Sequence, residues 1–95
     1  MGKSKKRSGV IAYTIDFTRR SRRQFLKLPV QIQNRISSHI DALGTEPRPS
    51  GCIKLKRFSD RYRIRVGAYR ILYEIRDDIL VVLVMEIGHR RDIYR

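Results

Sequence analysis

Cysteine is almost absent from this chain of 95 residues, and so is any long hydrophobic run. Cys52 has no second cysteine with which to form an intramolecular disulfide, so we expect a reducing compartment, the cytoplasm. One cysteine and two well-separated histidines do not supply the ligands of a zinc site, so we expect no metal and no cofactor. The longest apolar run, residues 79–85, is far shorter than the ~20 residues that a membrane-spanning helix needs. The basic N-terminus leads into only a short apolar stretch, so we expect no signal peptide.

Acidic residues are few as well, nine against 22 lysines and arginines, which gives a formal net charge of +13. A net positive charge of this size predicts an acidic binding partner. Nucleic acid is the first candidate, followed by an acidic protein and an anionic membrane. Arginine outnumbers lysine by 16 to 6. Because the guanidinium group binds phosphate through two parallel hydrogen bonds and stacks on bases, this bias favours a nucleic-acid partner over mere solubility.

The first half of the chain predicts one strand and two helices. Residues 1–9 are polar and basic and predict a disordered tail, and residues 10–95 are long enough for one domain only. Alternating apolar residues predict a strand over residues 10–17. Thr18 is a suitable N-cap for a helix over residues 19–28. Apolar residues spaced by three and four predict a second helix over residues 30–43, with Gly44 at its end.

The second half predicts a meander of four strands after a Pro- and Gly-bearing loop at residues 45–51. The apolar period of two predicts strands over residues 53–58, 61–66, 69–76 and 79–87. Gly67-Ala68 is typical of a type II′ turn, and Asp77-Asp78 predicts a second tight turn. The last strand is almost continuously apolar, so we expect it to be central, buried on both faces and ended by Gly88. The predicted fold is α+β, in the order β-α-α-β-β-β-β, with a helical hairpin on one face of a mainly antiparallel sheet of four to five strands.

The predicted turn at Gly67-Ala68 brings three arginines together. It pairs Arg65 with Arg70 and places Arg63 on the same face of the sheet, while the apolar residues of both strands take the other face beneath the helices. Like charges directly opposite each other destabilise a sheet by up to ~1 kcal/mol, so an anion that completes the cluster would explain it. A solvated basic face of a strand is the alternative interpretation.

The C-terminal segment adds groups with acid–base chemistry. The predicted second turn places Arg70 opposite Met85 and Gly88 just beyond that end of the sheet. The terminal residues could then fold back over the basic face, bringing His89, Arg90 and Tyr94 near the arginines. Metal-free RNA cleavage needs a proton acceptor, a proton donor and positive charge around the phosphate, which such a set supplies. A surface histidine and an aromatic anchor for the tail are the plainer interpretations of His89 and Tyr94.

Two segments carry a specific resemblance: residues 61–75, with Tyr69-Arg70-Ile-Leu-Tyr73, and residues 84–94, with Gly88-His89-Arg90 and Tyr94. Together, in this order, they resemble the RelE branch of the RelE/ParE toxin superfamily of bacteria and archaea, over residues 11–95. The resemblance implies the toxin of a type II toxin–antitoxin system. Its activity would be metal-independent cleavage of mRNA in the ribosomal A site, which inhibits translation and leaves a 2′,3′-cyclic phosphate and a 5′-hydroxyl.

The resemblance also implies roles for individual residues. The basic pair falls on Arg63 and Arg65, where the family often has lysine, and the phosphate-binding arginine falls on Arg70. Because arginine is hard to deprotonate, the general base would be His89 or Tyr94. The implied catalytic set is Arg63, Arg65, Arg70, His89, Arg90 and Tyr94. The basic residues expected to bind RNA and the ribosome are Lys54, Lys56, Arg57, Arg61, Arg19, Arg20, Arg22, Arg23 and Arg91.

The expected partners are mRNA, ribosomal RNA of the A site and a cognate acidic antitoxin, with which the chain could form a heterotetramer; no membrane is expected. Besides a toxin that has lost its activity by drift, two alternatives stay open at this point. One is the ParE-type activity on the same fold, inhibition of DNA gyrase without cleavage. The other is a non-catalytic RNA-binding module, for which the net charge alone would suffice.

Overall fold

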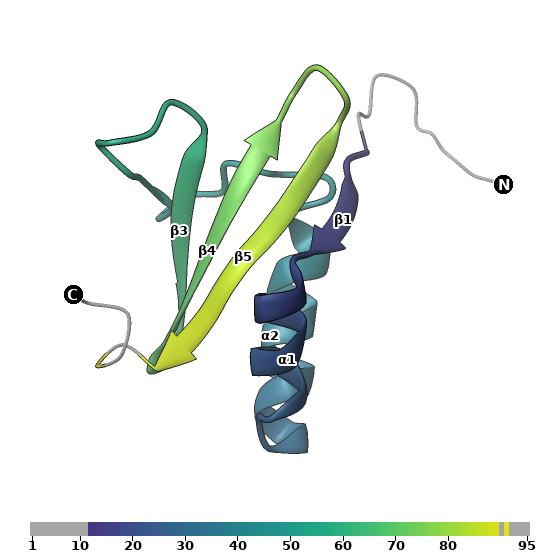
Figure 1. Cartoon of the computed structure of the whole chain (residues 1–95), viewed down its shortest axis with the longest axis vertical. Coiled ribbons are helices and arrows are strands. Elements are labelled where there is room, and N and C mark those ends of the chain that lie inside the picture. The colour runs from purple at the N-terminus through teal and green to yellow at the C-terminus, as the bar shows by residue number, and fades with distance from the viewer. Residues whose placement is uncertain (1–11, 90, 92–95) are drawn as a thin grey trace, which may run out of the picture.

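The computed structural model describes residues 12–89 and residue 91 (Figure 1). The predicted tail at residues 1–9 and the candidate residues Arg90 and Tyr94 lie outside the described residues. Seven elements follow one another along the chain: β1 (Thr14–Phe17), α1 (Arg19–Leu26), α2 (Val30–Ala42), β2 (Ile53–Lys54), β3 (Arg61–Val66), β4 (Tyr69–Arg76) and β5 (Val81–His89).

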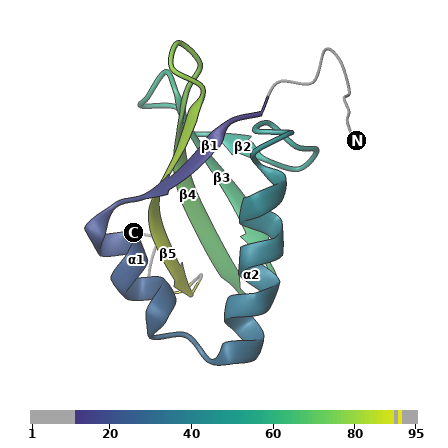
Figure 2. The same ribbon diagram turned by 90° about the vertical axis from the view of Figure 1, so that its right-hand side faces the viewer.

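The strands form one mixed sheet in the order β1-β5-β4-β3-β2. β1 runs parallel to β5, and every other neighbouring pair is antiparallel. The two helices form a hairpin on one side of this sheet, as Figure 2 shows from the helix side. The predicted α+β fold and element order are therefore confirmed.

The core lies between α2 and the sheet face turned toward it. The periodicities that predicted it are confirmed for α2 with its C-cap, which contribute buried residues spaced by four and three, and for β3 and β4, which contribute alternate residues. The buried apolar residues are Ile36, Ile40, Leu43, Tyr62, Ile64, Val66, Ile71, Tyr73, Ile75, Val82, Val84 and Ile87. The opposite, helix-free face carries the alternating residues of β3 and β4, which include the arginines.

α1 protects the outer edge of β5 beyond the point where β1 ends. The Thr18 side chain caps the helix by accepting a hydrogen bond from the Ser21 amide, as predicted, and its hydroxyl donates to the Met85 carbonyl at 3.2 Å. Ser21 is fully buried and its Oγ donates to the Val84 carbonyl at 2.7 Å. The Ile87 amide donates to Gln24 Oε1 at 2.8 Å. Side chains of the helix thus replace a neighbouring strand and fix α1 against β5.

We expect Ser21→Ala to lower the free energy of unfolding by about 1 kcal/mol, the usual net contribution of one hydrogen bond. Ser38→Ala is the matched control, because Ser38 is exposed and its hydroxyl donates to the Asn34 carbonyl within α2 itself. Urea unfolding of both variants measures the difference. Equal losses in the two variants would show that the bond across to β5 adds no stability.

Several element boundaries differ from the prediction. β1 begins at Thr14, α1 ends at Leu26, and β2 is limited to Ile53–Lys54. α2 ends one residue early, with Leu43 as its C-cap, so Gly44 follows directly as predicted. A side chain at Gly44 would place its Cβ 3.2 Å from the carbonyl oxygens of Asp41 and Tyr13, so close approach of β1 accounts for this glycine.

The connection between β4 and β5 was predicted wrongly. Arg76 pairs with Val81 rather than with Ile79, so the loop has four residues, Asp77 to Leu80, and Leu80 adopts a left-handed φ of 55°. A register shift between Leu72 and Tyr73 then leaves Met85 as an extra residue in β5. β5 also continues through Gly88 to His89, and it is not buried on both faces, because its buried residues alternate with half-buried ones. β5 is an interior strand of the sheet, as predicted, between β1 and β4, and β4 is the middle strand of the five.

A cluster of polar side chains holds this loop. The Asp77 carboxylate accepts hydrogen bonds from the Arg48 guanidinium at 2.8 Å and from the Tyr13 hydroxyl at 2.5 Å. Arg48 also donates to the Tyr62 hydroxyl at 3.1 Å and lies over the Tyr62 ring. The bond from Arg48, followed by that from Tyr13, lowers the pKa of Asp77 below its ordinary value. The bond to Asp77 raises the pKa of Tyr13.

This pKa shift predicts a pH-dependent contribution to stability. Because the pKa of Asp77 is lower in the folded chain, its contribution is present above the unfolded pKa of about 3.9 and is lost as pH falls through the folded value. We expect Asp77→Asn to be less stable than the parent protein in urea at pH 7, with the difference shrinking as pH falls below about 4. Asp78→Asn, a change at the exposed neighbour, is the control. A difference that stays constant with pH would contradict the assignment.

Candidate nucleic-acid interface

Three arginines meet on the helix-free face, as the sequence predicted. Arg65 pairs directly with Arg70, and Arg63, two residues earlier in β3, pairs with Leu72. Gly67 has a φ of +59°, the left-handed conformation that the first residue of the predicted turn requires. The register of this hairpin, and with it the placement of the three arginines, is confirmed.

Arg70 is the most enclosed of the three. Only 6% of the residue is exposed, whereas Arg65 is exposed and Arg63 is half-buried. Its neighbour on β5 is Gly88, which has no side chain, so the Arg70 side chain lies between Arg65 and a glycine. A guanidinium group fixed by its surroundings loses less conformational freedom when it binds an anion, which suits a phosphate-binding position.

Acidic residues on the same face lie beside other arginines. Glu74 is 8% exposed and accepts a hydrogen bond from Arg76 at 2.9 Å, with Arg61 at 3.7 Å. Glu86 lies 3.4 Å from Arg20 of α1. The described carboxylates of this face therefore lie at its flanks, beside Arg61, Arg76 and Arg20.

His89 does not join these arginines on their face. It pairs with Tyr69, so its side chain lies on the helix side of the sheet, where the two rings make an edge-on contact with centroids 5.5 Å apart. Its Nδ1 accepts a hydrogen bond from the Arg91 amide at 3.4 Å. The expectation that His89 shares the basic face is wrong, because β5 continues through Gly88 and successive residues of a strand point to opposite faces.

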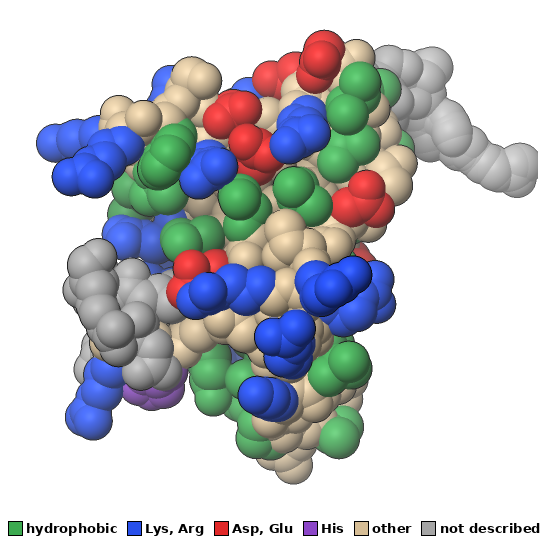
Figure 3. Space-filling view, in the orientation of Figure 1, with side chains coloured by type: hydrophobic (Ala, Val, Ile, Leu, Met, Phe, Trp, Pro, Cys, Tyr) green, Lys and Arg blue, Asp and Glu red, His purple; other side chains and the backbone are tan. Residues whose placement is uncertain are grey.

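The remaining basic residues of the predicted interface do not all point in one direction. Lys54 pairs with Tyr62 and so belongs to the helix side, whereas Arg61 lies over the Phe58 ring with its guanidinium carbon 4.2 Å from the centroid. Arg20 reaches Glu86, but Arg22 lies over the Phe17 ring at 5.9 Å. Figure 3 shows lysine and arginine side chains gathered over α1. The other predicted RNA- or ribosome-binding residues that the structure describes are all exposed: Lys56, Arg57, Arg19, Arg23 and Arg91.

A small pocket on the helix-free face was missed by the sequence analysis. It has a volume of about 300 Å³ and is lined by Leu55, Phe58, Arg61, Leu72, Met85, Glu86 and neighbouring residues. The alternation of Arg61 with Arg63 and Arg65 already places Arg61 on this face. No local signal places Glu86 there, because the extra residue in β5 determines its direction.

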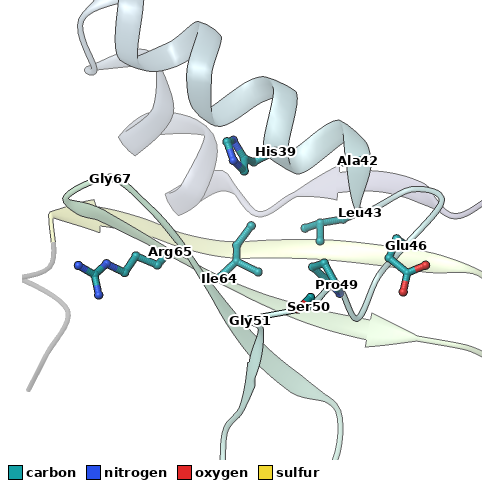
Figure 4. A pocket seen from close by; sticks show the side chains of 10 residues that line it. All are labelled: His39, Ala42, Leu43, Glu46, Pro49, Ser50, Gly51, Ile64, Arg65 and Gly67. Atoms are coloured by element: carbon teal, nitrogen blue, oxygen red, sulfur yellow. The ribbon is translucent and has the colours of Figure 1, made fainter.

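A second pocket, of about 570 Å³, lies between the C-terminal part of α2 and β3. Figure 4 shows Leu43 and Ile64 on its walls and the Arg65 side chain extending away from it. Its lining is mostly apolar, and it includes neither Arg63 nor Arg70. Arg65 is the one member of the arginine cluster that also lines this pocket.

Two further features are absent from the described residues. No group of three or more His, Cys, Asp or Glu side chains is placed to hold a metal ion in the part of the chain that the structure covers. No helix within residues 12–89 is long and apolar enough to cross a membrane.

Comparisons with known proteins agree on one family. Residues 15–94 match the family described as the ParE toxin of type II toxin–antitoxin systems, parDE. The toxin RelG of Mycobacterium tuberculosis is 34% identical over 87% of this chain and 97% of its own length. The mRNA interferase toxin RelE of Escherichia coli is 28% identical over 84% of this chain and 85% of its own length. The crystal structure of the RelBE2 toxin–antitoxin complex of M. tuberculosis contains a similar chain, with a TM-score of 0.75, 32% identity and coverage of 84% of this chain and 93% of that chain.

Proposed function

The chain belongs to the ParE toxin family of type II toxin–antitoxin systems, and we propose that it acts as a RelE-type endoribonuclease that cuts mRNA in the ribosomal A site without a metal. The family assignment supports a toxin, and the printed name of its E. coli relative, an mRNA interferase, supports RNA cleavage as the activity. The ribosome dependence and the individual steps belong to the proposal.

One observation carries the proposal: the enclosed Arg70 lies directly opposite Arg65, with Arg63 two residues along β3 on the same face. Cleavage of a phosphodiester builds negative charge on the phosphate oxygens in the transition state. Guanidinium groups held in place before the substrate arrives stabilise that charge without reorganising. Arg70 is enclosed in this way, and Arg65 and Arg63 lie beside it on the same face, so the hairpin suits a single RNA phosphate.

The proposed reaction is an internal transesterification. The ribose 2′-oxygen forms a bond to phosphorus as the bond from phosphorus to the 5′-oxygen of the next nucleotide breaks. A general base takes the 2′-hydroxyl proton, and a general acid donates a proton to the 5′-oxygen. The products are a 2′,3′-cyclic phosphate and a 5′-hydroxyl, and the balance requires neither water nor metal.

The arginines would hold the phosphate, with Arg90 as a fourth, and the base would be Tyr94 or His89. Because the imidazole of His89 packs against Tyr69 on the opposite side of the sheet from Arg70, this placement favours Tyr94. Arginine itself is too basic to act as the proton acceptor at neutral pH.

The proposed partners follow from charge and family. The net charge of +13 suits an acidic antitoxin, with heterotetramer formation as one arrangement, and also suits ribosomal RNA of the A site. Lys56, Arg57 and the exposed arginines of α1 would bind the RNA backbone rather than take part in the reaction. We assign the toxin activity to residues 10–95, a diffuse electrostatic role to residues 1–9, and a cytoplasmic location to the whole.

Induction of the chain in cells, followed by mapping of mRNA 5′ ends, tests the function. We expect translation to stop and new 5′-hydroxyl ends to appear inside codons, paired with 2′,3′-cyclic ends upstream. In a purified system, cleavage should require ribosomes. It should continue with EDTA present at a concentration that leaves the ribosomes intact. Intact mRNA and unchanged translation after induction would refute the proposal.

Gyrase inhibition is the second candidate, because the matched family is described by its ParE members. A supercoiling assay with purified gyrase separates the two activities. Inhibition of supercoiling without RNA cleavage would assign the chain to the ParE type. Salt-sensitive RNA binding with neither activity would leave only a basic binding module.

A further inference from the structure

We propose that the pocket beside the arginine cluster is a nucleobase subsite, which receives one unstacked base of the RNA and favours bases that carry an exocyclic amino group. The proposal rests on the proposed function, because it takes single-stranded RNA as the ligand. It adds a base-reading site to a surface so far assigned only to the RNA backbone.

The pocket lies directly beside the arginine cluster. Arg61 and Leu72 line the pocket, and Leu72 pairs with Arg63, so the pocket begins where the arginine cluster ends. Two residues of a strand span about 7 Å, so a phosphate at Arg63 and Arg70 and a base in the pocket are within reach of the same or adjacent nucleotides.

The lining of the pocket is largely apolar and includes one aromatic ring. Leu55, Leu72 and Met85 are half-buried, and Phe58 is 41% exposed although it is a large hydrophobic residue. The Arg61 guanidinium carbon lies over the Phe58 ring, 4.2 Å from its centroid. Proteins bind unstacked bases on aromatic rings and guanidinium planes, and a concave apolar site with a few polar groups is typical of small planar ligands. At about 300 Å³ the pocket has room for one base.

Glu86 supplies a carboxylate to the lining of this pocket, next to a face that carries several arginines. Its side chain is 26% exposed, and its contact with Arg20 at 3.4 Å is a partly exposed ion pair of the kind that contributes little stability. A carboxylate accepts hydrogen bonds from amino groups of bases, as in its pairing with the cytosine amino group. Uracil has no such amino group, so Glu86 would disfavour it.

Cleavage on ribosomes programmed with a single A-site codon tests the subsite. An abasic nucleotide is introduced at each codon position in turn, and single-turnover rates are measured for the parent protein and for Phe58→Ala. At one position we expect the abasic substitution to slow the parent protein about ten- to a hundredfold, the range found for loss of one base stack. Phe58→Ala should lose the same factor on normal RNA and nothing further on that abasic substrate. Ile79→Ala, which shortens an exposed hydrophobic residue of the β4–β5 loop, should behave like the parent protein.

Glu86→Gln tests the base preference. At the position found above, the parent protein should cut slowest with uracil, and Glu86→Gln should reduce the discrimination against uracil at least fivefold. If Phe58→Ala lowered the cleavage rate by the same factor on normal and on abasic RNA, the subsite would be overturned. That result is expected if the pocket receives a protein side chain instead. Unchanged discrimination in Glu86→Gln would overturn the preference for amino groups.

A binding measurement separates failure of the subsite from failure of the proposed function. A short RNA with 2′-O-methyl riboses and one 2-aminopurine cannot be cleaved by 2′-hydroxyl attack, and its fluorescence is quenched when the base stacks. We expect the parent protein to quench it and Phe58→Ala to quench it several-fold less at saturating protein. If the parent protein cleaves no mRNA, the proposed function fails, and this measurement still decides the subsite. Equal quenching by both proteins, or none by either, overturns it.

Discussion

Replacing Arg70 by methionine is expected to lower the rate of mRNA cleavage at least a hundredfold, because loss of one preorganised donor to a developing anion typically costs about 10²–10³ in kcat. Methionine keeps an unbranched side chain at this largely buried position while removing the charge and all donors. Arg70→Lys should be intermediate, since it keeps the charge but cannot make two parallel hydrogen bonds to one phosphate. Single-turnover rates on programmed ribosomes give the comparison, and cell growth after induction gives an independent readout.

Arg76→Met is the matched control for this prediction. Arg76 lies on the same strand and the same face, about 20 Å from Arg70 along β4, and pairs with Glu74 at 2.9 Å. We expect it to stay within about threefold of the parent rate, which corresponds to less than ~1 kcal/mol of activation free energy. Thermal unfolding by circular dichroism shows whether either variant has lost its fold. If Arg70→Met is folded and as active as Arg76→Met, the proposed role of Arg70 in binding the phosphate is wrong.

The arginine cluster could be predicted because its causes are local. The strict alternation of residues 61–66 and 69–76 determines which face each side chain takes, and a glycine with positive φ between them sets the register. Nothing distant in the sequence is needed for Arg65 to oppose Arg70. The helices were equally accessible, because Thr18 marks the start of α1 and α2 has a clear apolar stripe.

The position of His89 could not be predicted, because two non-local features shift β5 relative to β4. The four-residue loop moves the register by two residues, which leaves every side chain on its predicted face, and the extra residue at Met85 moves it by one more, which reverses the faces beyond it. Asp77 in the loop is held by residues 29 and 64 positions away in the sequence. The Met85 carbonyl accepts a hydrogen bond from Thr18, 67 positions away. These contacts exist only in the folded chain, so local patterns carry no sign of them.

The reversal of faces at the bulge turns His89 away from Arg70, so we expect the second large loss of activity at Tyr94. We expect Tyr94→Phe, which removes only the phenolic hydroxyl, to lower kcat by about 10²–10⁴, the contribution of one general acid or base. His89→Ala should lose much less, because the His89 ring contacts Tyr69 on the helix side, away from Arg70. The change from tyrosine to phenylalanine keeps the aromatic ring, so a residue that only stacks on a base or anchors the tail would tolerate it.

Single-turnover rates as a function of pH distinguish these roles. If the Tyr94 hydroxyl transfers a proton, Tyr94→Phe should lose the pH dependence that the parent protein shows, while His89→Ala should keep it at a similar rate. Normal binding of Tyr94→Phe to ribosomes would place the loss in the chemical step rather than in association. The opposite result, a hundredfold loss in His89→Ala beside an active Tyr94→Phe, would assign the proton transfer to the imidazole. It would then require the end of β5 to rearrange on the ribosome so that His89 reaches the face of Arg70, since one strand residue cannot present its side chain to both faces at once.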